Sequence, residues 1–119
     1  MPLIQIDLDR DLYEQHHEAL SEAIHQAQID ALDIPPSDRF QVFTPHGPSE
    51  LVFDPSYNDV ERRALVLVRI GMVHMYSVST KRGLYRAIVE RFGAVGIRSE
   101  DILISVVENG FEDWYAGRL

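Results

Sequence analysis

Hydrophobic and polar residues alternate at the start of the chain, a pattern typical of a strand with one buried face. Ile4, Ile6 and Leu8 share one side of a strand predicted over residues 3–8, and the residues between them are polar. The strand begins almost at the first residue. The amino terminus is therefore expected at the head of a buried element.

A long helix is predicted over about residues 12–32, because apolar residues recur there at intervals of three and four. Asp9 and Asp11 are both candidates for its amino-terminal cap, and Asp11 with Glu14 resembles a capping box. The Pro35-Pro36 pair is expected to stop the helix. Its predicted apolar stripe comprises Leu20, Ala23, Ile24, Ala27 and Ala31.

The middle of the chain is richer in turn-forming residues. Alternation predicts a strand over residues 39–43. Residues 44–48 are expected to form a loop, because two prolines and a glycine do not fit the hydrogen bonding of a sheet. A short strand over residues 50–53 and a short helical segment over residues 58–63 are predicted beyond the loop.

The second half opens with a nearly continuous apolar run over residues 64–75, which predicts a central strand buried on both faces. A second helix is expected to start at Ser77–Thr80 and to end at Gly93 and Gly96. A last long strand is predicted over residues 102–107. The apolar stripe of the second helix comprises Leu84, Ala87, Ile88 and Phe92.

The two halves match each other at a fixed offset of 63 residues, which places Leu3–Ile6 over Val66–Arg69. Each half, about residues 1–56 and 64–119, is therefore predicted as strand, helix, strand, a unit with a right-handed crossover. The predicted fold class is α+β. A single domain over residues 1–119 would hold duplicated βαβ units, forming a four-stranded sheet with two helices on one face.

Two helices cover only one face of such a sheet, yet the strands over residues 64–75 and 102–107 are apolar on both faces. The uncovered face therefore needs a partner. Another copy of the same chain is expected to supply it, which predicts a homo-oligomer. The alternative is a loop or the carboxyl-terminal tail folded across the sheet.

Composition and charge narrow the classes of function. The chain has 119 residues, 45% hydrophobic and 25% charged, a balance typical of one globular domain. A net charge of −8 argues against nucleic acid as a partner. The absence of cysteine excludes disulfides, thiolate nucleophiles and cysteine metal sites. There is no signal-peptide pattern and no apolar run near the ~20 residues that span a membrane, so a cytoplasmic protein without a membrane partner is expected.

The histidines are not predicted to bind metal. His16, His17 and His25 lie on the charged first helix without matching carboxylates, and all three are expected to be solvated. His46 lies in a predicted loop, where either a functional role or the shape of the loop explains it.

The chemistry predicted from the residues alone centres on Pro2. Methionine before a small second residue is normally removed in cells, and removal of Met1 leaves Pro2 as a free secondary amine. An amine at the head of a buried strand lacks water to stabilise its charge, so its pKa is expected to fall toward neutrality. A base poised near the working pH suits proton transfer. The alternative is that Met1-Pro2 simply starts a strand.

Several short motifs, in this order, resemble those of a known family. They are Met1–Leu3 at the start, Pro36–Gln41 as a proline-x-aspartate-arginine-aromatic-glutamine element, Thr44–Pro48 as a threonine-x-histidine-x-proline element, and Glu108-Asn109 with Asp113-Trp114. Together with the βαβ duplication, they identify a resemblance to the tautomerase superfamily. The closer similarity is to its malonate semialdehyde decarboxylase-like branch.

The resemblance implies a homotrimer with Pro2 in a pocket near a subunit boundary. Members of the superfamily move protons in keto–enol chemistry, hydrate unsaturated acids or decarboxylate β-keto acids. Asp38 matches the aspartate that works beside the proline, and Trp114 matches an aromatic pocket wall. The expected enzyme is a tautomerase that acts on a small 2-oxo or β-oxo acid without metal or cofactor.

The chain departs from the decarboxylase pattern at the end of the third strand. The branch carries two arginines there, one residue apart, and the corresponding positions here are His74 and Tyr76. His74 can supply one weaker charge, and Arg39, Arg69 or a partner subunit can substitute for the missing fork. Two alternatives therefore remain open: a decarboxylase or hydratase with a changed carboxylate clamp, and a trimeric binding protein without catalysis.

Overall fold

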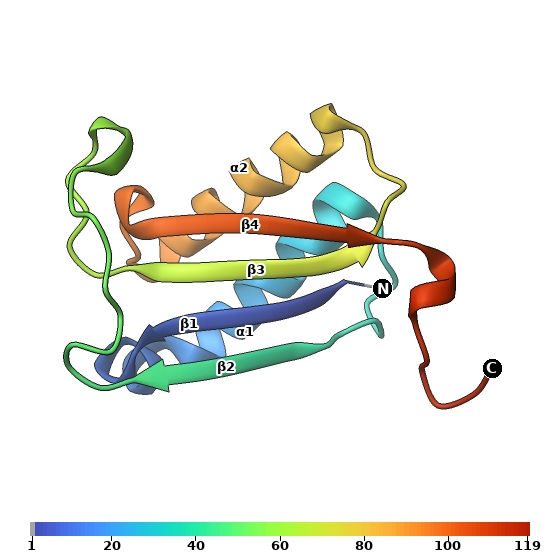
Figure 1. The fold of residues 1–119 in the computed structure, drawn as a ribbon, viewed down its shortest axis with the longest axis horizontal. Coiled ribbons are helices and arrows are strands. Elements are labelled where there is room, and N and C mark those ends of the chain that lie inside the picture. Colours follow the sequence, from blue (N-terminus) through green and yellow to red (C-terminus); the bar gives the residue numbers. More distant parts are fainter. Residues whose placement is uncertain (1) are drawn as a thin grey trace.

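The computed structural model describes residues 2–119, which form one mixed sheet with two helices packed on a single face (Figure 1). The strands lie in the order β2-β1-β3-β4. The predicted α+β fold class is therefore confirmed. The strands are β1 at Leu3–Asp9, β2 at Gln41–His46, β3 at Val66–Val73 and β4 at Ile102–Asn109.

Each half of the chain forms a βαβ unit with parallel strands. Ile4 of β1 lies opposite Gln41 of β2, and Val66 of β3 lies opposite Ile102 of β4. The two units meet through antiparallel pairing of β1 with β3. These two are the central strands, and the duplication inferred from the sequence is present in the fold.

Helix α1 spans Arg10–Leu32 and begins two residues earlier than predicted. Asp9 occupies the N-cap position without a side-chain cap hydrogen bond, and the capping box expected at Asp11 does not start the helix. The helix also ends before it reaches Pro35-Pro36. Asp33 takes the left-handed conformation (φ 57°), and its N–H bonds back to the last turn at 3.0 Å.

Helix α2 spans Val78–Val95 and is capped at both ends. The Ser77 hydroxyl accepts a hydrogen bond from the Thr80 N–H at 3.0 Å. Gly96 closes the helix at φ 112°, a conformation that glycine adopts without strain. Gly93, which was expected at the end, lies inside the helix.

The hydrophobic core lies between the sheet and the two helices. The predicted stripe of α1 is buried except for Ala31, which is half-buried. Burial of such side chains is the main force that holds the helices on the sheet. The fully buried residues include Ile4, Ile6 and Leu8 of β1, Leu20 and Ile24 of α1, and Leu84, Ile88 and Phe92 of α2.

Strand β2 continues through residues that were expected to form a loop. It runs to His46, with Pro45 opposite Leu8. The prediction failed because β2 is an edge strand, and an edge tolerates a residue that lacks an N–H. The strand predicted over residues 50–53 does not form, because this stretch is a bend followed by irregular chain, and the helical segment predicted beyond it shrinks to a short 3-10 helix at Tyr57–Asp59.

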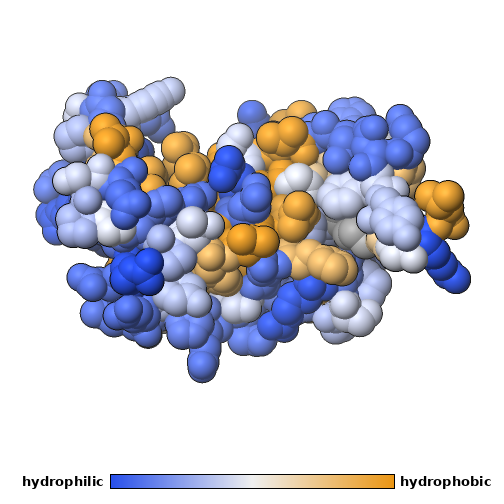
Figure 2. Space-filling model, turned by 60° about the horizontal axis from the view of Figure 1, so that its bottom comes forward, coloured by the Kyte–Doolittle hydropathy of each residue, from blue (hydrophilic) through white to orange (hydrophobic). Residues whose placement is uncertain are grey.

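The second face of the sheet has no helix over it. Val42 of β2 and Leu103 and Val107 of β4 are exposed there, and Arg69 of β3 lies on the same side. Within one chain, β3 is fully buried mainly on its helix-facing side, and cover of its second face by another copy stays a prediction. In the view of Figure 2, hydrophobic residues lie between hydrophilic ones and do not form one continuous patch. Within residues 2–119, neither helix is both long enough and apolar enough to cross a membrane.

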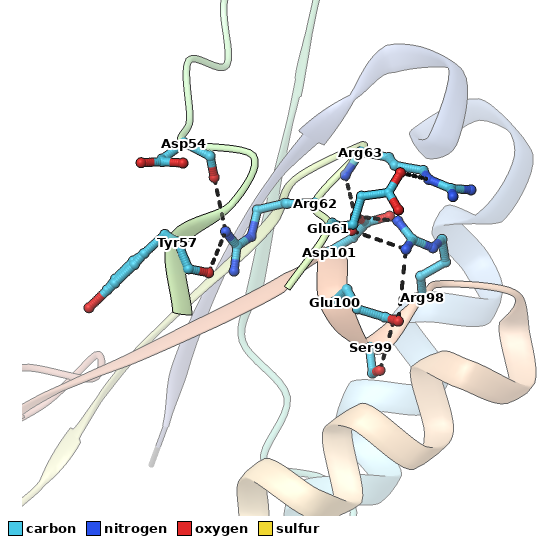
Figure 3. Close-up of polar contacts among 9 residues, drawn as sticks. All are labelled: Asp54, Tyr57, Glu61, Arg62, Arg63, Arg98, Ser99, Glu100 and Asp101. Carbon is cyan, nitrogen blue, oxygen red and sulfur yellow. Dashed lines mark hydrogen bonds and ion pairs between the residues drawn. The ribbon is translucent and has the colours of Figure 1, made fainter. Parts of the chain in front are cut away.

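The connection between β2 and β3 is anchored by charged residues at the end of the sheet far from the amino terminus (Figure 3). Buried Asp101 accepts hydrogen bonds from the Arg63 N–H at 2.7 Å and from the Arg98 guanidinium at 3.1 Å. Arg98 also donates to the Glu61 carbonyl at 3.0 Å. These bonds tie the connection to the start of β4.

Candidate active site

Four chain segments meet at the end of the sheet that carries the amino terminus (Figure 1). The starts of β1 and β2 lie there beside the ends of β3 and β4. The Ile4 N–H donates to the Phe40 carbonyl at 3.0 Å, and the His74 N–H donates to the Asn109 carbonyl at 2.8 Å. These backbone bonds bring residues far apart in sequence to one place.

An apolar cavity of about 400 Å³ lies at this end of the molecule. Leu3, Phe40 and the tail from Trp114 to Gly117 line it. The Trp114 indole N–H donates to the Asn109 side-chain oxygen at 2.7 Å, which fixes the tail across the strand ends. The structure thus places Trp114 in a cavity wall.

Pro2 is buried and directly precedes Leu3, one of the residues that line the cavity. Met1, whose removal was expected, lies outside the described residues. Burial at this position disfavours the charged form of an amine.

Asp38 and Tyr76 come together at the same end. Burial, and in second place the negative charge of Asp38, raises the pKa of the Tyr76 phenol. The phenol therefore stays protonated at neutral pH and can donate a hydrogen bond. Asp38 is half-buried in a turn, and its N–H donates to the Pro35 carbonyl at 2.9 Å.

His74 belongs to a small charged cluster at the ends of β3 and β4. Its Nδ1 lies 3.0 Å from one carboxylate oxygen of Glu108, and the Lys81 ammonium donates to the other oxygen at 2.9 Å. The hydrogen bond from Lys81 lowers the pKa of Glu108; His74 adds to this and burial opposes it. The His74 side chain is 77% exposed and so is accessible to a ligand.

The two arginines proposed as substitutes for the missing pair lie elsewhere in the chain. Arg39 points toward helix α1, where its guanidinium donates to Glu22 at 2.8 Å. Arg69 lies on the open face of the sheet and donates to Asp7 at 3.3 Å. The structure therefore brings neither guanidinium to the cavity within one chain.

The sequence analysis gave no role in the site to three side chains at this end, although two of them, Phe40 and Glu108, lie in the quoted motifs. Phe40 lines the cavity, and Glu108 with Lys81 holds His74. A polar residue that ends an apolar strand was the available signal for Glu108, because strand ends frequently carry functional side chains. Nothing in the sequence pattern pairs it with a lysine on α2.

The expectation that His25 is solvated is wrong. His25 is 4% exposed, and its Nε2 lies 2.8 Å from the Pro36 carbonyl oxygen. It sits beside Ile24 on the buried side of α1, which is wider than the predicted apolar stripe. His46 contacts Asp7 at 2.8 Å at the other end of the sheet. Among residues 2–119, no group of three or more histidine or carboxylate side chains is arranged to hold a metal ion.

Comparison with known proteins identifies the family. Two family models, both described as "Tautomerase enzyme", match residues 38–117 and 2–56. The chain belongs to the tautomerase superfamily. The resemblance inferred from the short motifs is thereby confirmed.

Individual relatives of this tautomerase superfamily member cover nearly its whole length. It is 35% identical to the probable tautomerase YusQ of Bacillus subtilis (strain 168), over 98% of this chain and 94% of the relative. A solved malonate semialdehyde decarboxylase inhibited by 3-bromopropiolate is 31% identical, with a TM-score of 0.91 over 97% of this chain and 88% of that one.

A second malonate semialdehyde decarboxylase structure, described as a basis for decarboxylase and hydratase activities, is 29% identical. Its TM-score is 0.89, over 98% of this chain and 91% of that one. A fused 4-OT symmetric trimer is 17% identical at a TM-score of 0.82, which shows the shared fold alone.

Proposed function

We propose that this protein is a cytoplasmic, cofactor-independent tautomerase that moves protons on a small 2-oxo or β-oxo acid. The observation that carries the proposal is the burial of Pro2 at the head of β1, next to an apolar cavity of about 400 Å³. Membership of the tautomerase superfamily supports the class of reaction.

In the proposed reaction, removal of Met1 exposes the Pro2 secondary amine. The neutral amine takes the proton of the enol hydroxyl, and the resulting ammonium gives a proton to the C=C carbon that does not carry the oxygen. The C=O bond forms as the C=C bond is lost, and the amine returns to its neutral starting state. Asp38 assists as an acid or as the group that orients water. Proton transfer by a positioned group contributes roughly 10²–10⁴-fold to a rate.

We assign substrate binding to side chains at the same end of the sheet as the cavity, of which Trp114 lines the cavity itself. The His74 imidazole meets the substrate carboxylate, the Tyr76 phenol donates a hydrogen bond, and Trp114 packs against the carbon chain. Since the Tyr76 phenol keeps its proton at neutral pH, it remains a donor throughout the working range. Arg39 and Arg69 are engaged by carboxylates of the chain itself, so we give them no direct contact with the substrate.

A second candidate function is decarboxylation or hydration of a related acid. Similarity to two malonate semialdehyde decarboxylase structures favours it. A third is ligand binding without catalysis, which the missing arginine pair favours. Product analysis with malonate semialdehyde and with acetylenic acids separates the first two functions. A chain that binds these acids without converting them supports the third.

We also propose that the protein is a homotrimer. Leu103 and Val107 of β4 are exposed on the face of the sheet that the helices do not cover. Further copies of the chain can cover this face in a closed ring, and a structural neighbour is described as a symmetric trimer. Light scattering during size-exclusion chromatography measures the oligomeric state, and a monomer at micromolar concentration contradicts the proposed homotrimer.

The decisive experiment compares Pro2→Ala with the intact protein. Intact mass first establishes that Met1 has been removed. Ketonisation of phenylpyruvate enol is then followed by absorbance, and Pro2→Ala is expected to lose at least roughly 100-fold in kcat/KM. Pro48→Ala, an exposed proline in the turn after β2, is the matched control and is expected to keep its activity.

Titration of the amino-terminal amine provides a second measurement. The proposal expects a pKa below the ~7.7–8.0 of an ordinary α-amine. Equal rates for Pro2→Ala and the intact protein would contradict the proposed function, as would a terminus that still carries Met1 in an active preparation.

A further inference from the structure

His25 is a buried polar residue that faces the segment entering β2. It lies on α1, is 4% exposed, and has its Nε2 2.8 Å from the Pro36 carbonyl oxygen. A carbonyl only accepts hydrogen bonds, so Nε2 must carry the proton. Among the described residues, the buried Nδ1 has no hydrogen-bond partner. A polar atom left in this state costs free energy and calls for an explanation.

Two further contacts join α1 to the same segment. The Arg39 guanidinium donates to Glu22 at 2.8 Å. The Ser21 hydroxyl donates to the Gln41 side-chain oxygen at 2.6 Å, and the Gln41 amide donates back to the Ser21 carbonyl at 3.1 Å. Helix α1 therefore holds the segment over residues 36–41 at three points.

The two side chains that alternate with these contacts, Asp38 and Phe40, belong to the candidate active site. Asp38 acts electrostatically on Tyr76, and Phe40 lines the apolar cavity. In an extended segment, successive side chains point to opposite sides. Arg39 and Gln41 thus face the helix, and Asp38 and Phe40 face the site.

The three contacts differ in the constraint they impose. The Arg39–Glu22 pair is exposed, and exposed ion pairs hold a geometry weakly. The Ser21–Gln41 pair lies beyond Asp38, inside β2. The bond from His25 comes from a side chain that is itself buried, and it reaches the turn that contains Asp38, where the Asp38 N–H also bonds to the Pro35 carbonyl.

We infer that His25 is a positioning residue of the active site, which fixes the Pro36–Asp38 turn through its hydrogen bond to the Pro36 carbonyl. This inference rests on the proposed role of Asp38 in proton transfer. His25 itself does not touch the substrate. A displacement of about 1 Å at a catalytic group can cost roughly 100-fold in rate.

The test compares substitutions of His25 with a control on the same helix. His25→Leu removes the donor and is expected to lower kcat roughly 10- to 100-fold, with KM changed less than about threefold. His25→Gln places an amide near the position of Nε2 and is expected to restore kcat to within about threefold. Gln28→Leu removes a side chain that is equally buried but bonds only within its own helix, at Ile24, and is expected to keep kcat.

An activity-independent measurement separates this inference from the proposed function. Hydrogen exchange of the Asp38 amide is expected to accelerate in His25→Leu and to stay unchanged in Gln28→Leu. If His25→Leu does not fold, His25→Asn, whose side chain is too short to reach the Pro36 carbonyl, replaces it. An inactive wild-type protein contradicts the proposed function, and the exchange measurement still decides the role of His25. Unchanged exchange and unchanged kcat in His25→Leu overturn the inference, as does an equal loss in Gln28→Leu.

Discussion

His74 and Glu108 face each other across the ends of β3 and β4, with the imidazole Nδ1 3.0 Å from a carboxylate oxygen. The other carboxylate oxygen accepts a hydrogen bond from the Lys81 ammonium, so the single carboxylate contacts two basic side chains. When His74 is protonated, the cluster carries a net positive charge next to the candidate site.

This arrangement predicts how stability depends on pH. The folded-state pKa of Glu108 is lowered, chiefly by the hydrogen bond from Lys81, so the carboxylate contributes stability above its unfolded pKa of 4.5. The contribution disappears as the pH falls below that value and through the folded pKa. Glu108→Gln is expected to unfold more easily than wild type at pH 7, with a smaller difference near pH 4. Urea unfolding at both values measures this.

Glu112→Gln is the control for this prediction, because Glu112 is an exposed carboxylate in the turn that follows β4. The stability of Glu112→Gln is expected to differ from that of wild type equally little at pH 7 and at pH 4. A difference between Glu108→Gln and wild type that stays constant from pH 7 to pH 4 would show that the charge of Glu108 is not its source.

The elements were largely predictable because local patterns report on burial. The alternation of Ile4, Ile6 and Leu8 identified β1, and the 63-residue offset placed β3 in the second unit. The failures lie where tertiary context overrides local preference. Pro45 is tolerated in β2 only because that strand is an edge, and the strand order is not encoded in any short segment.

The candidate site was less predictable than the fold. The motif that contains Asp38 and the Trp114 motif lie at the end of the sheet that carries Pro2, and their roles in the site stay a prediction. The partners of Arg39 and Arg69 could not be inferred, because Glu22 and Asp7 are distant in sequence and their proximity depends on how α1 and β1 pack. His25 was misassigned for a related reason: the buried side of α1 is wider than the predicted apolar stripe, and the acceptor of its hydrogen bond, Pro36, lies 11 residues further along the chain.

Asp101 is predicted to be a main anchor of the connection before β3. Asp101→Ala leaves the Arg63 N–H and the Arg98 guanidinium without their acceptor (Figure 3). Arg98 is partly exposed, so the loss of stability is expected to be about 2–3 kcal/mol, below the ~3–5 kcal/mol of fully buried pairs. Urea unfolding measures the loss. Glu100→Ala, at the neighbouring half-exposed carboxylate, is expected to cost under about 1 kcal/mol, and equal losses would contradict the prediction.

Trp114 is the only tryptophan of the chain, and it lines the apolar cavity. Its fluorescence is therefore expected to report on ligands that enter the cavity. Titration with pyruvate, the simplest 2-oxo acid, should change the emission in a saturable manner. A change that rises linearly, as collisional quenching of free indole does, would show that pyruvate does not occupy the cavity. The same titration of Trp114→Phe measures the change in emission that does not come from Trp114.

Replacement of His74 by arginine tests the carboxylate-binding role of this position. Arginine is permanently charged and binds a carboxylate through two parallel hydrogen bonds. His74→Arg is expected to lower KM for a 2-oxo acid roughly three- to tenfold at pH 7.5, with little change in kcat. A larger gain is not expected, because an exposed side chain is screened by solvent. His74→Ala is expected to raise KM by a similar factor.

His16→Arg is the matched control, since it changes a histidine of α1 to arginine away from the candidate site. If a general increase in positive charge attracted the acidic substrate, both arginine variants would lower KM equally. If KM falls only in His74→Arg, the effect therefore comes from the position of residue 74 and not from the overall charge. An unchanged KM in both His74→Arg and His74→Ala would remove this side chain from the substrate-binding site and leave Tyr76 as the polar contact at the end of β3.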